Sequence, residues 1–230
     1  MSDQVEYYNH FGELYKTAIL TCPEPEFWTT DYQEKGRIYV EMRERVSRQA
    51  ALVEKFFSTE FPVLDVGCGF GRQAMLLAKK GFSVVGADSS KIFIEIATEL
   101  FEERQLPGKF LNDDLEDVSP NQFRQLILFD VLEHIKVSSR RRFLTKMHSL
   151  SFSGAVLIVS IPHLKKRVTS WVNNKLRKKI TQNFSYFFTR EEHPYPIPTA
   201  QDMRALLKGL FTILIFEETP ATDYYVLRKL

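Results

Sequence analysis

The hydrophobic positions of the chain follow two periodicities, which is typical of strands that alternate with helices. Short apolar runs bounded by Gly, Pro or polar residues predict strands at 61–66, 83–87, 108–111, 126–129 and 155–161. Apolar residues at spacings of three and four predict helices over 33–57, 73–80, 91–104, 140–150 and 200–208. Two last apolar runs, 211–216 and 224–227, predict a closing pair of strands.

The order of these elements predicts an α/β fold. Parallel strands need a long crossover connection, and the helices between the predicted strands supply it. The link between the last two strands covers only residues 217–223, so this pair must be antiparallel. The sequence therefore predicts a seven-stranded, mostly parallel sheet with six parallel strands, one antiparallel strand, and helices on both faces.

The composition is that of a globular protein large enough for one core. The chain has 230 residues, of which 44% are apolar and 26% charged. The longest uninterrupted apolar stretches, such as 155–159, fall far short of the roughly 20 residues of a membrane helix. No basic stretch followed by an apolar one opens the chain, so we expect no secretory signal. The two cysteines, Cys22 and Cys68, are too few for a disulfide framework, and we expect a cytoplasmic protein.

The net charge of +2 conceals a strong asymmetry along the chain. Residues 134–190 contain thirteen Lys and Arg residues and no Asp or Glu. The remainder holds 31 − 13 = 18 basic residues against 29 acidic ones, a balance of −11. Such a basic segment suits an anionic partner or an anionic membrane surface.

Residues 63–71 read Val-Leu-Asp-Val-Gly-Cys-Gly-Phe-Gly and carry the most chemical information. Glycines let the backbone pass close to a ligand, and the helix that follows presents free N–H groups. A dinucleotide fingerprint needs Gly-x-Gly-x-x-Gly, but Arg72 stands where the third glycine should be. A cationic or zwitterionic ligand fits better, because Asp65 can face an ammonium group.

Asp88 ends the second predicted strand, 88 − 67 = 21 residues after the first glycine. An acidic residue at about this distance usually accepts hydrogen bonds from the hydroxyls of a ribose. The alternative is an N-cap for the helix that begins near Lys91, although Ser89 or Ser90 could also supply that cap.

Four blocks in order, 63–71, 84–88, 110–117 and 128–135, give the chain a recognisable pattern. With these blocks the sequence resembles the class I S-adenosylmethionine-dependent methyltransferases, in the branch of small-molecule and ubiquinone-pathway enzymes. The resemblance covers residues 61–161 and implies a Rossmann-like fold with S-adenosyl-L-methionine as cofactor. Two departures are Asp113, where a glycine is usual, and Arg124, where an acid is usual.

The resemblance also implies the residues that hold the cofactor. The loop would be shaped by Gly67, Gly69 and Gly71, with the backbone of Cys68. Asp88 would hold the ribose, Ser89 and Leu115 would lie against the adenine, and Asp114 would accept from the adenine amino group. Asp65 would approach the methionine amine, and Phe129 and Asp130 would flank the methionine moiety. The unusual Asp113 leaves open whether Asp113 or Asp114 contacts the adenine.

Methyl transfer to oxygen or to a protonated amine also calls for a base. The first candidate is His134, which follows the strand end beside the methionine moiety, although it could equally pack against the next helix. His163 and His193 are alternatives at the rim. Asp130, Glu133 and His134 also have the spacing of a Mg²⁺ site, but two carboxylates and one histidine are too ambiguous a ligand set, and we predict no metal.

We interpret residues 1–230 as one methyltransferase domain. Its predicted parts are an N-terminal helical cap at 1–60, a cofactor-binding core at 61–161, a basic insert or lid at 162–199, and a helix with two strands at 200–230. Within the insert, 164–181 combines basic residues with Trp171, which suits either a solvated lid or a peripheral contact with an anionic membrane. Nucleic acid ranks lower, because no RNA-binding module is recognisable.

The sequence therefore predicts an enzyme that transfers a methyl group from S-adenosylmethionine to O or N of a small organic acceptor, with a lipid-like or anionic acceptor as one alternative. Two other classes stay open. One is a non-catalytic cofactor- or membrane-binding subunit. The other is a nicotinamide-dependent oxidoreductase, which Arg72 disfavours.

Overall fold

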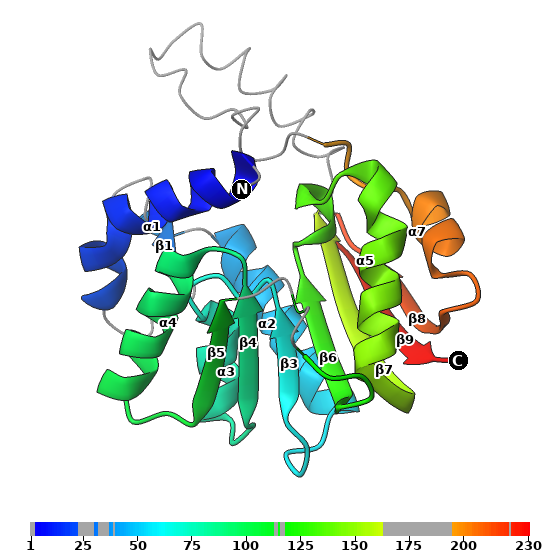
Figure 1. The fold of residues 1–230 in the computed structure, drawn as a ribbon, viewed down its shortest axis with the longest axis horizontal. Coiled ribbons are helices and arrows are strands. Elements are labelled where there is room, and N and C mark those ends of the chain that lie inside the picture. Colours follow the sequence, from blue (N-terminus) through cyan, green and yellow to red (C-terminus); the bar gives the residue numbers. More distant parts are fainter. Residues whose placement is uncertain are drawn as a thin grey trace, which may run out of the picture.

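Seven strands form one central sheet with helices packed on both of its faces (Figure 1). The computed structural model describes residues 3–22, 30–31, 37–38, 40–112, 115, 118–162, 195–220 and 222–230. The strands of this sheet are β3 (Val63–Val66), β4 (Val84–Asp88), β5 (Gly108–Asn112), β6 (Phe123–Phe129), β7 (Ser151–Pro162), β8 (Phe211–Glu218) and β9 (Thr222–Lys229). Two further short strands, β1 (Thr30–Asp31) and β2 (Arg37–Ile38), pair with each other.

The strand order is β5-β4-β3-β6-β7-β9-β8, and only β9 runs against the others. The predicted arrangement of six parallel strands and one reversed strand is thereby confirmed. β6 is the middle strand of this order, and β3 lies beside it, between β4 and β6. In open α/β sheets the carboxyl ends of strands at such a switch point are where ligands bind.

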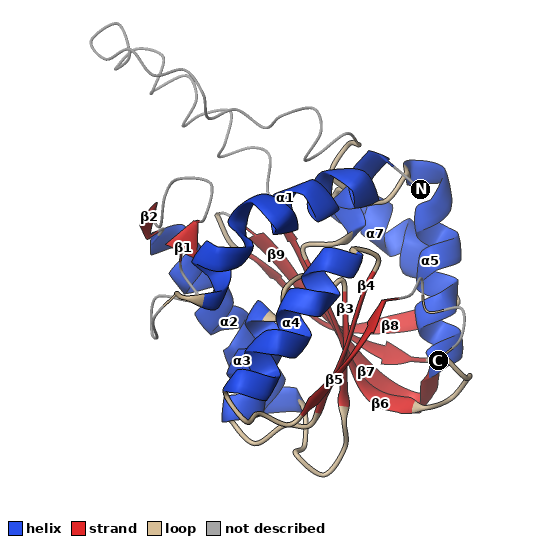
Figure 2. Ribbon diagram, turned by 60° about the vertical axis from the view of Figure 1, so that its left-hand side comes forward, coloured by secondary structure: helices blue, strands red, loops and turns tan. Residues whose placement is uncertain are grey.

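The helices divide between the two faces of the sheet (Figure 2). They are α1 (Asp3–Leu20), α2 (Val40–Phe56), α3 (Arg72–Lys79), α4 (Lys91–Glu103), the 3₁₀ turn η2 (Leu132–His134), α5 (Val137–Leu150) and α7 (Ala200–Leu207). The core on one face combines residues of the four helices α1, α2, α3 and α4 with strand residues such as Ile127 and Val226. The core on the other face joins α5 and α7 with residues such as Leu128 and Leu227. Alternate residues of each strand thus serve opposite cores.

The structure shifts several predicted element boundaries, among them the starts of α2 and β6. The helix expected over 33–57 begins only at Val40, and β2 precedes it. The strand expected to begin at 126 begins at Phe123. The hydrophobic pattern missed this start because Gln125, although buried, is polar and does not count as a core position. Its side-chain amide donates to the carbonyl oxygens of Ser58 and Phe61, both at 2.9 Å, so its burial leaves the amide satisfied.

Candidate active site

The glycine loop between β3 and α3 holds three residues in the left-handed region, with φ of 72° at Gly67, 54° at Gly69 and 84° at Gly71. A Cβ at Gly67 would lie 2.5 Å from Cγ2 of Val131, so packing within the protein requires glycine there. At Gly69 the nearest atom would be Cδ2 of Phe93 at 3.8 Å, an ordinary contact. No neighbouring side chain therefore excludes a Cβ at Gly69. A backbone without a side chain at such a position is expected where a ligand approaches.

Asp88, at the end of β4, is bound to this loop. One of its carboxylate oxygens accepts from the backbone N–H of Gly69 at 2.9 Å, and the other accepts from that of Ser90 at 2.8 Å. Burial raises the pKa of the Asp88 carboxyl, while these two backbone hydrogen bonds act to lower it. The N-cap of α4 is Ser90, whose hydroxyl accepts from Phe93 N–H at 3.2 Å, so the alternative role of Asp88 as a cap is wrong.

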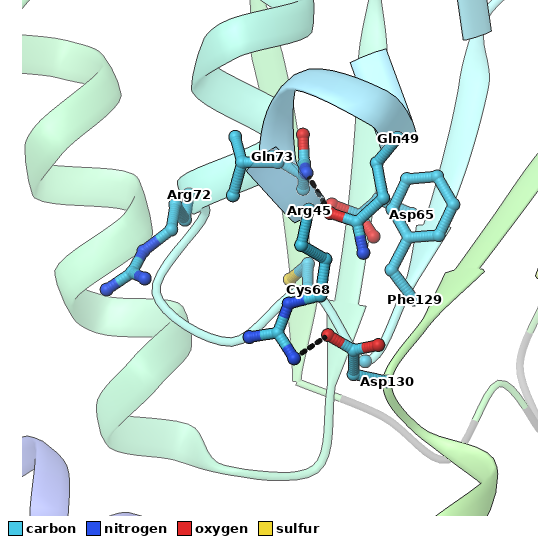
Figure 3. A pocket seen from close by; sticks show the side chains of 10 residues that line it. Arg45, Gln49, Asp65, Cys68, Arg72, Gln73, Phe129 and Asp130 are labelled. Atoms are coloured by element: carbon cyan, nitrogen blue, oxygen red, sulfur yellow. Dashed lines mark hydrogen bonds and ion pairs between the residues drawn. The ribbon is translucent and has the colours of Figure 1, made fainter. Parts of the chain in front are cut away.

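A pocket opens beside the loop at the carboxyl ends of β3 and β6 (Figure 3). Five of the residues predicted to bind the cofactor line it: Asp65, Gly67, Cys68, Phe129 and Asp130. The pattern of the sequence missed the other five, Arg45, Val46 and Gln49 from α2 and Arg72 and Gln73 from α3. The spacing of Arg45 and Gln49 by four, on one face of a helix, was the only local signal for them.

Asp65 is an unmatched carboxyl in the wall of this pocket. Its residue is only 3% exposed, and Oδ2 has no hydrogen-bond partner among the described residues. Burial, followed by repulsion from Asp88, raises the pKa of Asp65 from 3.8 to about 7. A buried carboxyl without a donor costs free energy, and a ligand with N–H groups or a positive charge would remove that cost.

An ion pair crosses the same pocket between Arg45 of α2 and Asp130, which follows β6 (Figure 3). The Arg45 guanidinium lies 3.0 Å from Oδ2 of Asp130, and both side chains are about four-fifths buried. Asp130 is one of four non-glycine residues at positive φ in the described chain, with φ of 57°. Such conformations persist where the surroundings hold them, and they concentrate at ligand sites.

His134 lies at the end of η2, and helix α1 reaches it. The Tyr8 hydroxyl is 3.3 Å from Nδ1 and 3.4 Å from Nε2 of His134, with the two rings edge to face. Nε2 of His134 is also 3.9 Å from a carboxylate oxygen of the buried Glu133. On its other side α1 is anchored to α4, because the Asn9 side chain accepts from the Ser90 hydroxyl at 2.8 Å. The pairing of Tyr8 with His134 left no signal in the sequence pattern.

Of the remaining residues predicted for the site, some lie within the described part of the chain and others lie outside it. Gly71 packs its backbone against Ala97, Ser89 is exposed, and Leu115 is buried in the core on the α5 face. Burial raises the pKa of the Cys68 thiol. Asp114, His163, His193 and the whole of 164–181 lie outside the described residues. In the part of the chain that is described, no three His, Cys, Asp or Glu side chains gather as metal ligands.

Residues 63–154 match the family model described as a methyltransferase domain. Over these residues the chain is similar to a methyltransferase domain. This domain comprises the strand β3, the glycine loop, Asp88 and the turn with His134, and the resemblance noted from the sequence is thereby confirmed.

Curated relatives match the methyltransferase domain over part of their length. The ubiquinone biosynthesis O-methyltransferase of Rickettsia canadensis is 27% identical over 157 residues, which cover 61% of this chain and 64% of that protein. The enzyme of the same name from Coxiella burnetii is 36% identical over 75 residues, 32% of each chain. The chain thus spans 64% and 44% of the lengths of two Rickettsia relatives, those from R. canadensis and R. typhi.

Solved structures show the same fold around the methyltransferase domain. Magnesium protoporphyrin IX methyltransferase from Synechocystis PCC 6803, with bound SAH, superposes with a TM-score of 0.68 at 18% identity over 98% of this chain and 97% of that one. The PH0226 protein from Pyrococcus horikoshii gives 0.67 at 20% identity, over 84% and 92%. Among the described residues, no helix has the length and apolarity needed to cross a membrane.

Proposed function

We propose that the protein is a methyltransferase that uses S-adenosyl-L-methionine to methylate an oxygen or nitrogen atom of a small organic acceptor. The observation that carries the proposal is the pocket beside the glycine loop, where the unmatched Asp65 lies near the Arg45–Asp130 ion pair. An amino-acid zwitterion is complementary to such a site, because its ammonium group meets carboxylates and its carboxylate meets a guanidinium. The names of the relatives favour oxygen as the methylated atom.

The residues present fit this cofactor. Asp88 already receives two backbone N–H groups, and a carboxylate has lone pairs left for two ribose hydroxyls. Arg45, which lines the pocket, would bind the carboxylate of the methionine moiety, and Asp65 or Asp130 would bind its ammonium group. When bound, S-adenosylmethionine supplies an electrophilic methyl group on a sulfonium sulfur.

The remaining task of the protein is to hold the acceptor and receive its proton. A neutral imidazole carries one unprotonated ring nitrogen that can accept a proton, and the Tyr8 hydroxyl, which contacts His134, can orient its ring. Helix α1, which carries Tyr8, contacts both α4 and His134 of η2, and we expect it to help to exclude water from the reacting groups. His163 and His193 stay predictions, as does the division of the chain into cap, core, insert and C-terminal part.

The test is calorimetric titration with S-adenosylhomocysteine and with NAD, followed by incubation with methyl-labelled S-adenosylmethionine and a panel of phenols, carboxylic acids and amines. We expect binding of S-adenosylhomocysteine, no binding of NAD, and label in an organic acceptor. Binding of NAD alone would establish the oxidoreductase alternative. Cofactor binding without transfer to any acceptor would favour the non-catalytic alternative.

The basic segment supports a second proposal, a peripheral contact with an anionic membrane. Residues 134–190 have thirteen positive and no negative side chains, with Trp171 among them. Each basic residue near an anionic surface contributes about 1 kcal/mol, and salt weakens the contact. Changing Lys175, Arg177, Lys178 and Lys179 to Glu should abolish co-sedimentation with phosphatidylserine vesicles at low salt. No sedimentation of the wild-type protein would refute this contact. The cytoplasmic location stays a prediction.

A further inference from the structure

A continuous chain of side-chain hydrogen bonds runs from α3 through α2 and β7 to Asp130. The Gln73 amide donates to the Gln49 carbonyl oxygen, as drawn in Figure 3. The Gln49 amide donates to the Ser160 hydroxyl at 2.9 Å, and that hydroxyl donates to Oδ1 of Asp130 at 2.7 Å. Gln49 is 2% exposed and Ser160 is fully buried, so the middle of this hydrogen-bond chain is shielded from water.

The charge of Asp130 sets the direction of every bond in this chain. A carboxylate only accepts, so Ser160 must donate its single hydroxyl proton to Asp130. Ser160 then accepts from the NH₂ group of Gln49, which turns the Gln49 carbonyl oxygen toward Gln73. Only one orientation of the two amides forms all of these hydrogen bonds. Reversing either amide would place two donors or two acceptors against each other.

The chain of hydrogen bonds ends on the carboxylate of Asp130, a residue whose backbone is strained. Asp130 has φ of 57°, and its N–H donates to the Ser160 carbonyl at 3.1 Å. Oδ1 is occupied by Ser160, so Oδ2 is the oxygen that faces Arg45. Without the Ser160 hydroxyl the carboxylate could rotate, and the ion pair in the pocket would lose its fixed partner.

We propose that Gln49 and Ser160 are positioning residues that fix the Asp130 carboxylate for the charged amino-acid part of the ligand. This inference rests on the proposed function, because it takes the ligand to be S-adenosylmethionine or its product. It predicts that the two residues affect only ligands with an amino-acid part. A role limited to packing would not distinguish such ligands from the bare nucleoside.

The test compares S-adenosylhomocysteine with 5′-methylthioadenosine, which keeps the nucleoside and lacks the amino acid. We expect Ser160→Ala and Gln49→Leu to weaken S-adenosylhomocysteine binding about tenfold, as for the loss of a hydrogen bond to a charged group. Binding of 5′-methylthioadenosine should change less than about twofold. The matched control is Ser151→Ala, because Ser151 is also fully buried on β7 but donates to the Met147 carbonyl, away from Asp130.

Thermal unfolding establishes that each variant is folded. If Gln49→Leu does not fold, the test rests on Ser160→Ala, which removes only one oxygen atom. A folded Ser160→Ala protein with the wild-type preference for S-adenosylhomocysteine overturns the inference. Equal weakening of both ligands also overturns it, because that indicates a general change in the pocket. If the wild-type protein binds neither ligand, the proposed function itself fails.

Discussion

The Tyr8 hydroxyl lies 3.3 Å from Nδ1 of His134, although the two residues are 126 positions apart in the chain. The contact joins the N-terminal helix to the turn that follows the central strand β6. It places a hydroxyl and an imidazole together at the edge of the sheet where the glycine loop also lies.

The pair yields a kinetic prediction. His134→Gln should lower kcat about 100-fold, because general base catalysis is lost, and Tyr8→Phe about tenfold, because the ring loses its orienting partner. Both variants should bind S-adenosylhomocysteine within about twofold of the wild type. Methyl transfer is measured with the acceptor found in the labelled assay. Tyr15→Phe on the same helix is the control, and unchanged kcat in His134→Gln would exclude His134 as the base.

Gly69 provides a test of where the ligand approaches. Alanine at Gly69 meets no close atom, so Gly69→Ala should fold and cost about 1 kcal/mol for the left-handed backbone. S-adenosylhomocysteine binding should nevertheless fall by at least about tenfold, because the methyl group occupies the ligand's approach. Gly81→Ala is the matched control, since φ is +88° and nothing lies within 4 Å. Equal binding by the two variants would place the ligand elsewhere.

Asp88 should recognise the ribose. We compare 5′-methylthioadenosine with its 2′-deoxy analogue in the wild type and in Asp88→Ala. The wild type should prefer the ribose form about tenfold, and Asp88→Ala should lose that preference. The variant should also be less stable, because Gly69 and Ser90 each lose a hydrogen bond. A preference for the ribose form that persists in folded Asp88→Ala would remove Asp88 from the ribose site.

Asp65 predicts a pH dependence of stability. Its pKa is raised to about 7, so between the unfolded value of 3.8 and pH 7 the folded state binds more protons than the unfolded state. Stability from this group therefore falls as pH rises across that range, and the loss is complete above pH 7. Asp65→Asn lacks the charge at every pH.

Relative to the wild type, Asp65→Asn should gain on the order of 2–3 kcal/mol more at pH 8 than at pH 5, because about two pH units separate pH 5 from the folded pKa. Urea unfolding at the two pH values measures the difference. The same variant should bind S-adenosylhomocysteine more weakly, since the ammonium group loses a partner. Parallel pH profiles of the two proteins would show that Asp65 does not titrate as described.

Local patterns in the sequence determined most of the sheet and the glycine loop. Apolar runs mark β3, β4 and β7 because a strand buried on both faces has few polar positions. The glycines of the loop and Asp88 follow from short-range geometry, since a tight turn and a strand end lie within about twenty residues. Where a polar residue is buried, as at Gln125, the pattern misplaced the boundary.

Only the tertiary structure decided which distant residues complete the site. Arg45 pairs with Asp130, Tyr8 contacts His134, and the Gln49 amide reaches Ser160, 111 positions away. None of these pairs shows in hydrophobic periodicity, because polar side chains on a helix look like any solvated face until the fold brings a partner to them. The sequence by itself determined the sheet and the glycine loop. The packing of α1 and α2 against that sheet decided which charges and which candidate base lie around the loop.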